Sequence, residues 1–554
     1  MIHYQICQIF SDFLPRVLWR SPPRTLAFCS FPEILPPATT MSPLVSALFG
    51  PLCGVLVVSC VFLLRLISNR SRLPLPPGPK KLPLVGNLFD MPAEEEWETY
   101  QKWSRDFDSD IIHLNVAGKS IIILSSLEAT NDLMVQRSAI YSDRPRFPMV
   151  NELMGWEFSL GFMKYGRRWR AERKIFNTAF SVGASSQFQP MELASTHGML
   201  RRILKSPDSC MLEQIDQMTG GLIMSIAYGI DVLPTNDPYI KLARESMEGL
   251  ALGGVPGKYL VDAIPALKYI PAWLPGAGFK REALEWRKVT QQSVVLPFEE
   301  AKRKIATGKA PTSFVSNALS MEWPEHDPDY SEDSIRDTAG TIFNAGSHTT
   351  VSVLGTFMLA MLRHPEIQKK AQMEIDLVVG RDRLPTLEDK PALQYITALV
   401  KELLRWKPVV PLSPHFVAVE DEYRGYRIPA GSIVLGNTWA ILNDEALYPA
   451  PLKFHPERFL SAGQRDGKNP DPEWAFGYGR RACPGKFMAL DNLWITVASL
   501  LAVFDISKAV GEDGNVIEPT YKYCTGLVCM PLPFKSSIRP RSKRSAELVE
   551  ATAL

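Results

Sequence analysis

The decamer at residues 476–485, Phe-Gly-Tyr-Gly-Arg-Arg-Ala-Cys-Pro-Gly, constrains this chain more than any other feature. It presents Cys483 on a loop that contains Gly479 and Gly485, with Arg481 two residues before the cysteine. Because glycine has no Cβ, the backbone can turn closely around a flat ligand. A thiolate in such a loop can ligate a haem iron, and the arginine offers bidentate donors to a haem propionate. A buried, inert cysteine in a tight turn is the alternative interpretation.

This loop resembles the haem-binding loop of the cytochrome P-450 superfamily. It matches the family pattern at Phe476, Gly479, Arg481, Cys483 and Gly485, and five matched positions argue against the inert cysteine. The resemblance implies a mainly α fold with small β-sheets. It also implies that these residues bind haem b, with Cys483 as the metal ligand.

Length and composition set broader limits. With 554 residues, 46% of them hydrophobic, the chain can bury a large core, and length alone suggests about three domains. The resemblance runs from about residue 73 to about residue 537, so we expect one catalytic domain at 81–537. A formal net charge of +2 gives no indication of nucleic-acid binding. The eight cysteines include no Cys-x-x-Cys pair, so neither a disulfide framework nor a structural zinc site is expected.

An apolar segment near the N-terminus predicts a membrane anchor at 41–68. No charged residue lies between positions 34 and 64, and residues 44–64 are long and apolar enough to cross a bilayer. Arg65, Arg70 and Arg72 follow, which predicts a single-pass protein of the endoplasmic reticulum membrane with a cytosolic body. A cleaved signal peptide is the alternative. We expect residues 1–40 to be a disordered or non-native extension, with Met41 as the natural start.

The remaining chain reads as mostly helical. Residues 69–80 form a stiff, proline-rich connector. Two strands are expected at 111–124 and another strand pair at 426–434. A long helix is predicted at 331–362, with Ser331 as its N-cap and an end before Pro365. The apolar, proline-broken segment 261–279 cannot be one helix, and we expect a basic, mobile tail at 538–554.

Two helical patterns add support for a haem site. Glu402 and Arg405 lie three residues apart, and Arg458 follows in a Pro-Glu-Arg-Phe stretch. By resemblance these three residues form a buried Glu-Arg-Arg cluster that supports the haem face. Trp169 and Arg173 share one helical face, and the resemblance places Arg173 at a haem propionate with Trp169 beside it.

Further contacts follow from the same resemblance. His415 is implied as another propionate contact. The neighbours of Trp169 include four basic residues: Arg167, Arg168, Arg170 and Lys174. Their positive charge suits the binding of an acidic electron-donor protein, and a solvated basic helix is the alternative.

The centre of the long predicted helix reads Ala-Gly-Ser-His-Thr-Thr at 345–350. A glycine there costs about 1 kcal/mol relative to alanine, so some compensating role is expected. By resemblance Thr349 hydrogen-bonds the oxygen substrate during proton delivery. His348 stands where the family usually has an acid; histidine can relay protons near neutral pH, and a packed residue is the alternative.

These observations favour a membrane-anchored monooxygenase that inserts one atom of dioxygen into a lipophilic small molecule, a secondary metabolite or xenobiotic. The amino-acid sequence of the chain resembles those of microsomal enzymes of this family and of fungal secondary-metabolite hydroxylases. Electrons are expected from an NADPH-dependent flavoprotein reductase. The predicted pocket segments are 147–162, the helix near Phe343, 409–412 and 526–528. A reductase-independent rearranging enzyme and a non-catalytic haem sensor or carrier remain as alternatives.

Overall fold

The structure is a computed structural model that describes residues 73–553 except 208, 255–257, 325–326, 462–467 and 525. The extension at 1–40, the anchor at 41–68 and the first residues of the connector therefore lie outside the described residues. The chain divides into two compact units. In the first, the described part is residues 73–75 with a hairpin of β4 (Asp421–Tyr423) and β5 (Tyr426–Ile428), and Arg427 N donates to Pro74 O. The second unit, Pro76–Glu420 with Pro429–Leu554, holds the rest.

The sheet of the second unit has the strand order β1-β2-β6-β3. Its strands are β1 (Ile111–Val116), β2 (Lys119–Leu124), β3 (Leu412–Val417) and β6 (Ser432–Asn437). The hairpin predicted at 111–124 is confirmed. The pair predicted at 426–434 is wrong: β5 pairs with β4, whereas β6 pairs with β2 and β3. The parallel β2–β6 pairing joins segments far apart in the chain, which no local pattern reveals.

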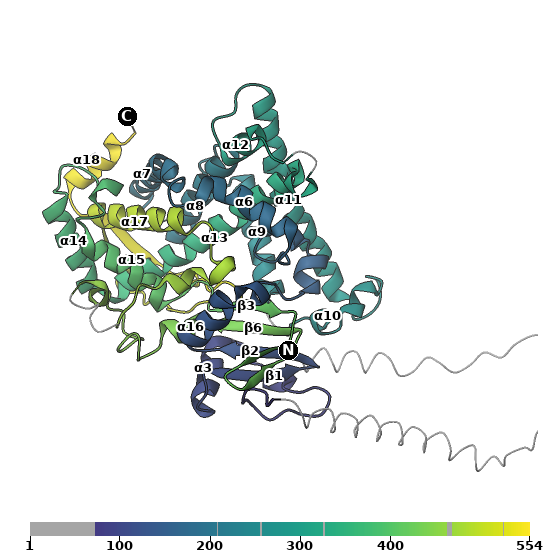
Figure 1. The fold of residues 1–554 in the computed structure, drawn as a ribbon. Coiled ribbons are helices and arrows are strands. Elements are labelled where there is room, and N and C mark those ends of the chain that lie inside the picture. The colour runs from purple at the N-terminus through teal and green to yellow at the C-terminus, as the bar shows by residue number, and fades with distance from the viewer. Residues whose placement is uncertain are drawn as a thin grey trace, which may run out of the picture. The chain divides into compact units, whose positions relative to one another are not determined.

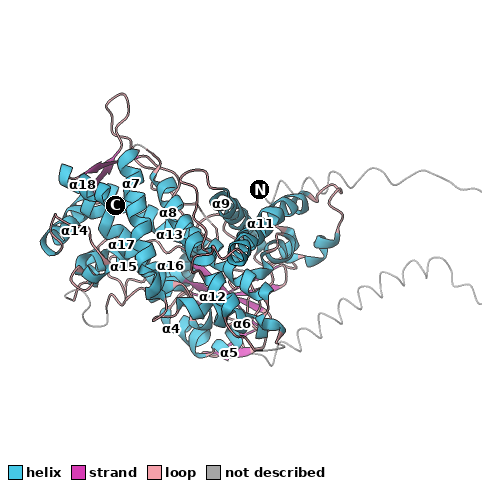
Figure 2. Ribbon diagram, turned by 90° about the horizontal axis from the view of Figure 1, so that it is seen from above, coloured by secondary structure: helices cyan, strands magenta, loops and turns pink. Residues whose placement is uncertain are grey.

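Helices make up most of the second unit, as Figures 1 and 2 show. Those that precede the longest helix are α3 (Glu96–Asp106), α4 (Leu127–Thr130), α5 (Ser138–Tyr141), α6 (Arg167–Phe180), α7 (Gln189–Lys205), α8 (Met211–Tyr228), α9 (Pro238–Gly253), α10 (Leu260–Ala263), α11 (Gly278–Ala306) and α12 (Phe314–Ser320). The longest helix is α13 (Glu332–Arg363), and the helices that follow it are α14 (Pro365–Val378), α15 (Gln394–Trp406), α16 (Thr438–Leu442), α17 (Lys486–Val503) and α18 (Lys543–Ala551). Between α17 and α18, the strands β7 (Phe504–Lys508) and β8 (Ser536–Pro540) form a separate two-stranded sheet.

The longest helix, α13, confirms the prediction for 331–362. The Ser331 side chain accepts a hydrogen bond from Ser334 N, and the helix ends at Arg363, two residues before Pro365. Its 32 residues span about 48 Å at 1.5 Å per residue. It packs against α6, α8, α9, α11 and α17, so one element contacts most layers of the unit. Both α13 and α17 are long and apolar enough to cross a membrane, but both are mostly buried in this unit.

Gly346 shows why a glycine is tolerated in the middle of α13. A Cβ at this position would lie 2.8 Å from Cδ1 of Ile223 on α8, which is closer than carbon atoms approach. The helix-weakening effect of glycine is therefore offset by close packing of α8 on α13.

The proline-broken segment 261–279 is divided, as predicted. α10 ends at Ala263, a 3-10 helix spans Pro265–Tyr269, and α11 begins at Gly278. Large apolar side chains are exposed here, with Tyr269 and Trp273 more than three-quarters accessible.

The C-terminal tail differs from the expectation of a mobile segment. Residues 536–540 form β8, which pairs with β7, and α18 follows with a capping box at Ser542. Arg541 binds the carboxylate of Asp376 on α14 at 2.8 Å. The basic residues suggested a solvated tail, but one of them forms a tertiary ion pair that local sequence does not indicate.

Candidate functional site

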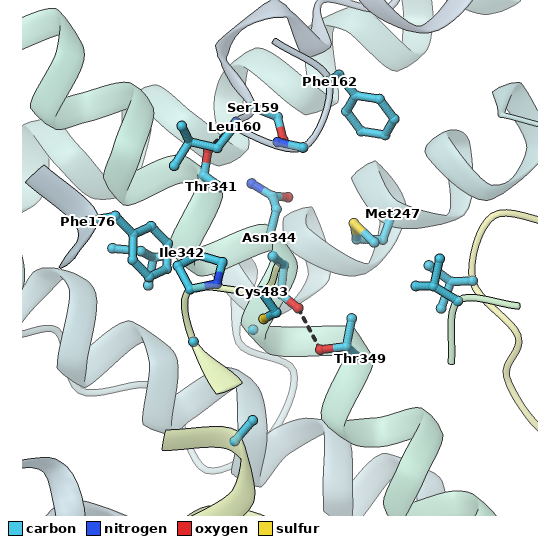
Figure 3. A pocket seen from close by; sticks show the side chains of 18 of the residues that line it. Ser159, Leu160, Phe162, Phe176, Met247, Thr341, Ile342, Asn344, Thr349 and Cys483 are labelled. Atoms are coloured by element: carbon cyan, nitrogen blue, oxygen red, sulfur yellow. Dashed lines mark hydrogen bonds between the residues drawn. The ribbon is translucent and has the colours of Figure 1, made fainter. Parts of the chain in front are cut away.

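A cavity of about 350 Å³ lies within the second unit, between α13 and the loop before α17. Each segment predicted to line a pocket contributes to it, through residues such as Phe162, Asn344, Val410 and Val528. Figure 3 shows that Asn344, Thr349 and Cys483 lie around the same space. Most of the lining is apolar, and the described lining residues include no aspartate or glutamate.

The cysteine loop brings Cys483 to one wall of this cavity. Cys483 N donates to Phe476 O at 2.7 Å, which closes the loop. Gly479 has a φ of +52°, and a Cβ there would lie 2.3 Å from Met134 O, so only glycine fits. Gly485 also lines the cavity, and a Cβ there would meet nothing within 4 Å.

The charge state of the Cys483 thiol depends on opposing effects. Burial raises its pKa, while a hydrogen bond from the Gly485 backbone and the positive charges of Arg173 and Lys486 lower it. Cations and an amide donor next to the sulfur are the groups that stabilise a thiolate.

Three arginines line the cavity. Arg481, which is 8% exposed, donates to carbonyls of Ser142, Leu160 and Met163 at 2.7–3.0 Å. Arg144 donates to Gly161 O and Pro414 O. Burial, followed by the charge of Arg144, lowers the pKa of Arg481 to about 8, and the nearby carboxylate of Asp143 offsets only part of that shift.

Trp169 and Arg173 both lie on α6, as the spacing predicted. Trp169 is buried, its Nε1 donates to Leu160 O at 3.3 Å, and the Arg481 guanidinium stacks 4.5 Å from its ring centroid. Arg173 lines the cavity with its guanidinium 5.9 Å from the same ring system. Burial lowers the pKa of Arg173. The tryptophan therefore positions both arginines.

His415 lies behind the cavity wall. Its neighbours Ser413 and Pro414 line the cavity, but His415 itself does not. Its Nδ1 is 2.7 Å from Tyr141 O, and since a carbonyl only accepts, Nδ1 carries the proton. Burial, and then the charge of Arg144, holds its pKa well below the usual range, so the ring is neutral.

Arg144 is the functional candidate that sequence reasoning missed. It belongs to the irregular Asp143-Arg144-Pro145 stretch and has no helical partner to mark it. The proline fixes the local backbone, which is the one signal that could have drawn attention to this arginine.

The resemblance implied that Glu402, Arg405 and Arg458 form one cluster; the structure brings the three together, and none of them lines the cavity. The Glu402 carboxylate accepts from Arg405 at 2.7 and 2.9 Å and from Arg458 at 3.1 Å. All three side chains are buried. Arg405 also donates to Leu442 O and Pro451 O, so the cluster ties α15 to the chain that precedes the cysteine loop.

The two central residues of α13 differ in position. Thr349 lines the cavity, and its Oγ1 donates to Ala345 O at 2.9 Å (Figure 3). His348 is not a lining residue; it is 6% exposed, and its Nδ1 has no hydrogen-bond partner among the described residues. Burial lowers the His348 pKa, the Asp216 carboxylate raises it, and Arg244 lowers it.

Comparison with known proteins agrees with this geometry. The family model for cytochrome P450 matches residues 76–537. A cytochrome P450 monooxygenase of Postia placenta is 45% identical over 88% of this chain and 95% of its own length. A cytochrome P450 monooxygenase of Armillaria gallica is 43% identical, covering 89% and 97%. The tryptamine 4-monooxygenase of Psilocybe cyanescens is also 43% identical, covering 86% and 94%.

A cysteine and three arginines that line one largely apolar cavity, on a mainly helical fold, are the arrangement expected of a haem-thiolate protein. The chain belongs to the cytochrome P450 family, is a monooxygenase and resembles fungal secondary-metabolite enzymes of that family.

The haem that this family implies fits the residues present. Arg144, Arg173 and Arg481 surround the cavity without a carboxylate partner in the described chain, and two propionates would supply the missing negative charge. The open space at Gly485, beside Cys483, leaves room for a flat group next to the sulfur.

Proposed function

We propose that this chain is a membrane-anchored haem-thiolate monooxygenase that inserts one atom of dioxygen into a lipophilic small molecule. The observation that carries the proposal is the position of Cys483 and Thr349 on one largely apolar cavity. When bound, haem b supplies the one-electron and dioxygen chemistry.

The residues around the cavity divide the work of holding the cofactor. Cys483 is the metal ligand, in a loop shaped by Phe476, Gly479 and Gly485. Arg144, Arg173 and Arg481 bind the propionates, and Trp169 keeps the last two in place. His415 lies behind the cavity lining, where its ring donates to the Tyr141 carbonyl and orients it. Glu402, Arg405 and Arg458 stabilise the fold around the loop and take no part in the reaction.

Proton delivery falls to α13. The Thr349 hydroxyl lies at the cavity wall, where it donates to Ala345 O, and it could turn to donate into the cavity, where the haem would supply the dioxygen chemistry. His348, the preceding residue, is the candidate source of a replacement proton because imidazole can accept at one nitrogen and donate at the other.

The lining favours an apolar, uncharged substrate, such as a secondary metabolite or xenobiotic. Phe147, Trp156, Phe162, Met247 and Leu250 supply apolar and aromatic surface. An ammonium group would find no carboxylate among the described lining residues. The name of one relative, tryptamine 4-monooxygenase, therefore suggests an aromatic substrate here more than a cationic one.

Electron supply and location complete the proposal. Single electrons come from an NADPH-dependent flavoprotein reductase, and exposed cations on α6 and in the cysteine loop suit an acidic partner: Arg170, Lys174 and Arg480. The segment 44–64 anchors the protein in the endoplasmic reticulum membrane with the catalytic unit in the cytosol.

The test is reductase-dependent NADPH oxidation by the purified full-length protein, with product analysis across terpenoid, polyketide, aromatic and fatty-acid panels. We expect oxygenated product and a red-shifted Soret band of the ferrous carbon-monoxide complex. Cys483→Ser removes that band, and Cys210→Ser, at a residue that does not line the cavity, retains it. Product without reductase would favour the rearranging enzyme, and haem binding without any turnover would favour the sensor or carrier.

A further inference from the structure

A second cavity lies in the same unit, apart from the one that Cys483 lines. Its volume is about 250 Å³, and it shares no lining residue with the first cavity. It lies where the C-terminal ends of α13 and α15 meet α16 and the loop between β7 and β8. Besides two leucines, its lining consists of four aromatic residues and two cations: Trp406, Trp439, Tyr521, Tyr523, Arg363 and Lys407.

The two cations of the second cavity lie over aromatic rings. Lys407 Nζ lies 4.7 Å from the ring centroid of Trp439 and 5.2 Å from that of Tyr523. The guanidinium carbon of Arg363 lies 5.4 Å from the ring centroid of Tyr521. Neither cation forms an ion pair within the described chain, and the described lining includes no aspartate or glutamate. The lining therefore carries two positive charges that no lining carboxylate neutralises.

Two carboxylates act on these residues from outside the lining. Burial and a neighbouring glutamate raise the pKa of Glu98 on α3, and Lys407 lowers it. Burial and then Glu518 raise the pKa of Tyr521, but Glu518 is itself paired with Lys508 at 2.7 Å. The Tyr521 hydroxyl is buried and forms no hydrogen bond of ordinary geometry among the described residues. A lining residue thus keeps a spare hydrogen-bond donor.

The aromatic walls are held in place, and the cavity is open to solvent. Trp406 Nε1 donates to Leu452 O at 3.0 Å, and the Tyr523 hydroxyl donates to Thr356 Oγ1 at 3.2 Å. The Leu452 side chain, which also lines the cavity, is 71% exposed, and Arg363 is exposed as well. A small molecule can therefore enter from the surface and meet rings whose positions are already fixed.

We propose that the second cavity is a binding site for a planar aromatic carboxylate. The tryptophan and tyrosine rings contact the flat faces of the ligand, and Arg363 and Lys407 supply the positive charge that its carboxylate requires. A neutral aromatic compound would leave both cations unpaired, and an inorganic anion would leave the aromatic walls uncovered. The site is separate from the cavity of Cys483, so the inference does not depend on the proposed oxygenation.

A structural role for the two cations is the competing explanation. Arg363 is the last residue of α13 and Lys407 is the C-cap of α15, and positive charge at a helix C-terminus is favoured by the helix dipole. Cation–π contacts then stabilise the helix ends without any ligand, and water fills the cavity. This explanation predicts no preference for an aromatic anion.

The experiment is isothermal titration calorimetry of the haem-loaded full-length protein, with an iron-ligating imidazole inhibitor occupying the first cavity. The titrants share one ring system and differ in charge: 2-naphthoate, neutral 2-naphthalenemethanol and cationic 2-naphthylmethylamine. Lys407→Met and Arg363→Met each remove one positive charge and keep an extended side chain. Lys369→Met is the matched control, because Lys369 is an exposed lysine of α14 that lines neither cavity.

We expect saturable binding of 2-naphthoate, binding of the alcohol weaker by roughly 10-fold, and no measurable binding of the amine. Each methionine variant should weaken 2-naphthoate binding by roughly 10-fold, and Lys369→Met should leave it unchanged. Lys407→Arg and Arg363→Lys, which keep the charges, should retain most of the affinity.

A photo-cross-linking measurement on the wild-type protein locates the site without any variant, so it serves if the variants fold poorly. Irradiation with 4-benzoylbenzoate, followed by peptide mapping, should label residues 406–407, 439 or 521–523, and excess 2-naphthoate should suppress the label. No saturable binding, equal affinity for the alcohol, or labels confined to other segments would overturn the inference and leave the proposed function standing. Absence of reductase-dependent turnover would overturn the proposed function and leave this site unaffected.

Discussion

Glu402→Gln should destabilise the catalytic unit strongly while leaving the cavity chemistry intact. The substitution keeps the side-chain shape but removes the negative charge that faces Arg405 and Arg458. The Glu402 carboxylate is 0% exposed, and it also accepts from His455 N at 2.8 Å. Loss of one partner of a buried ion pair costs about 3–5 kcal/mol because the remaining charge stays buried.

That cost is a large share of the usual 5–15 kcal/mol of folding free energy, and it corresponds to roughly 10²-fold to 10⁴-fold in the unfolding equilibrium. Glu457→Gln is the matched control. Glu457 lies in the same stretch as Arg458 and pairs with Lys370 at 2.5 Å, but both side chains are partly exposed. Such surface pairs contribute about 0–1 kcal/mol.

The assay compares urea midpoints, followed by far-UV circular dichroism, and the haem retained after purification. Glu402→Gln should lower both well below the values of Glu457→Gln, whereas substrate affinity in the surviving haem-loaded fraction should stay unchanged, since the cluster does not line the cavity. Equal urea midpoints for the two variants would refute the reasoning that removing one charge from this buried cluster lowers the free energy of unfolding.

Three further outcomes are expected. Gly479→Ala should lower the urea midpoint and the haem content, because a left-handed backbone costs about 1–2 kcal/mol and the new Cβ would overlap Met134 O. The control Gly183→Ala, where a Cβ meets nothing within 4 Å, should lower neither, and equal effects of the two substitutions would contradict this reasoning. Thr349→Ala should keep haem and substrate binding but reduce coupled turnover roughly 10²-fold and raise peroxide, with normal peroxide counting against its role. Deletion of residues 1–40 should leave targeting intact and the sequon at Asn69 unglycosylated in sealed microsomes, since the cytosolic orientation keeps it from the lumen; a glycan there would disprove that orientation.

The sequence predicted correctly those elements whose stabilising contacts lie between residues close together in the chain. The hairpin at 111–124 needs only its own turn, and α13 is marked by its Ser331 cap and by Pro365. The sequence failed where the partner is distant. β6 pairs in parallel with β2, and the tail is fixed by the contact of Arg541 with Asp376.

The same division holds for the site. Spacing within one helix brought Trp169 and Arg173, and Glu402 and Arg405, onto shared faces, because a helix turns once in 3.6 residues. Arg144 joins the cavity from an irregular stretch that has no periodicity, so it was missed. His415 was predicted as a propionate contact from the resemblance alone; in the structure Ser413 and Pro414 line the cavity and His415 lies behind them.

The three carbonyl contacts of Arg481 have a consequence for how the enzyme acquires its specificity. Ser142, Leu160 and Met163 belong to the segment that forms one wall of the cavity, and the same guanidinium lines the cavity where we propose that it binds a haem propionate. A haem propionate that binds Arg481 would therefore also affect the position of that wall. Cofactor loading and substrate affinity are then thermodynamically linked, and by reciprocity a bound substrate should slow the loss of haem.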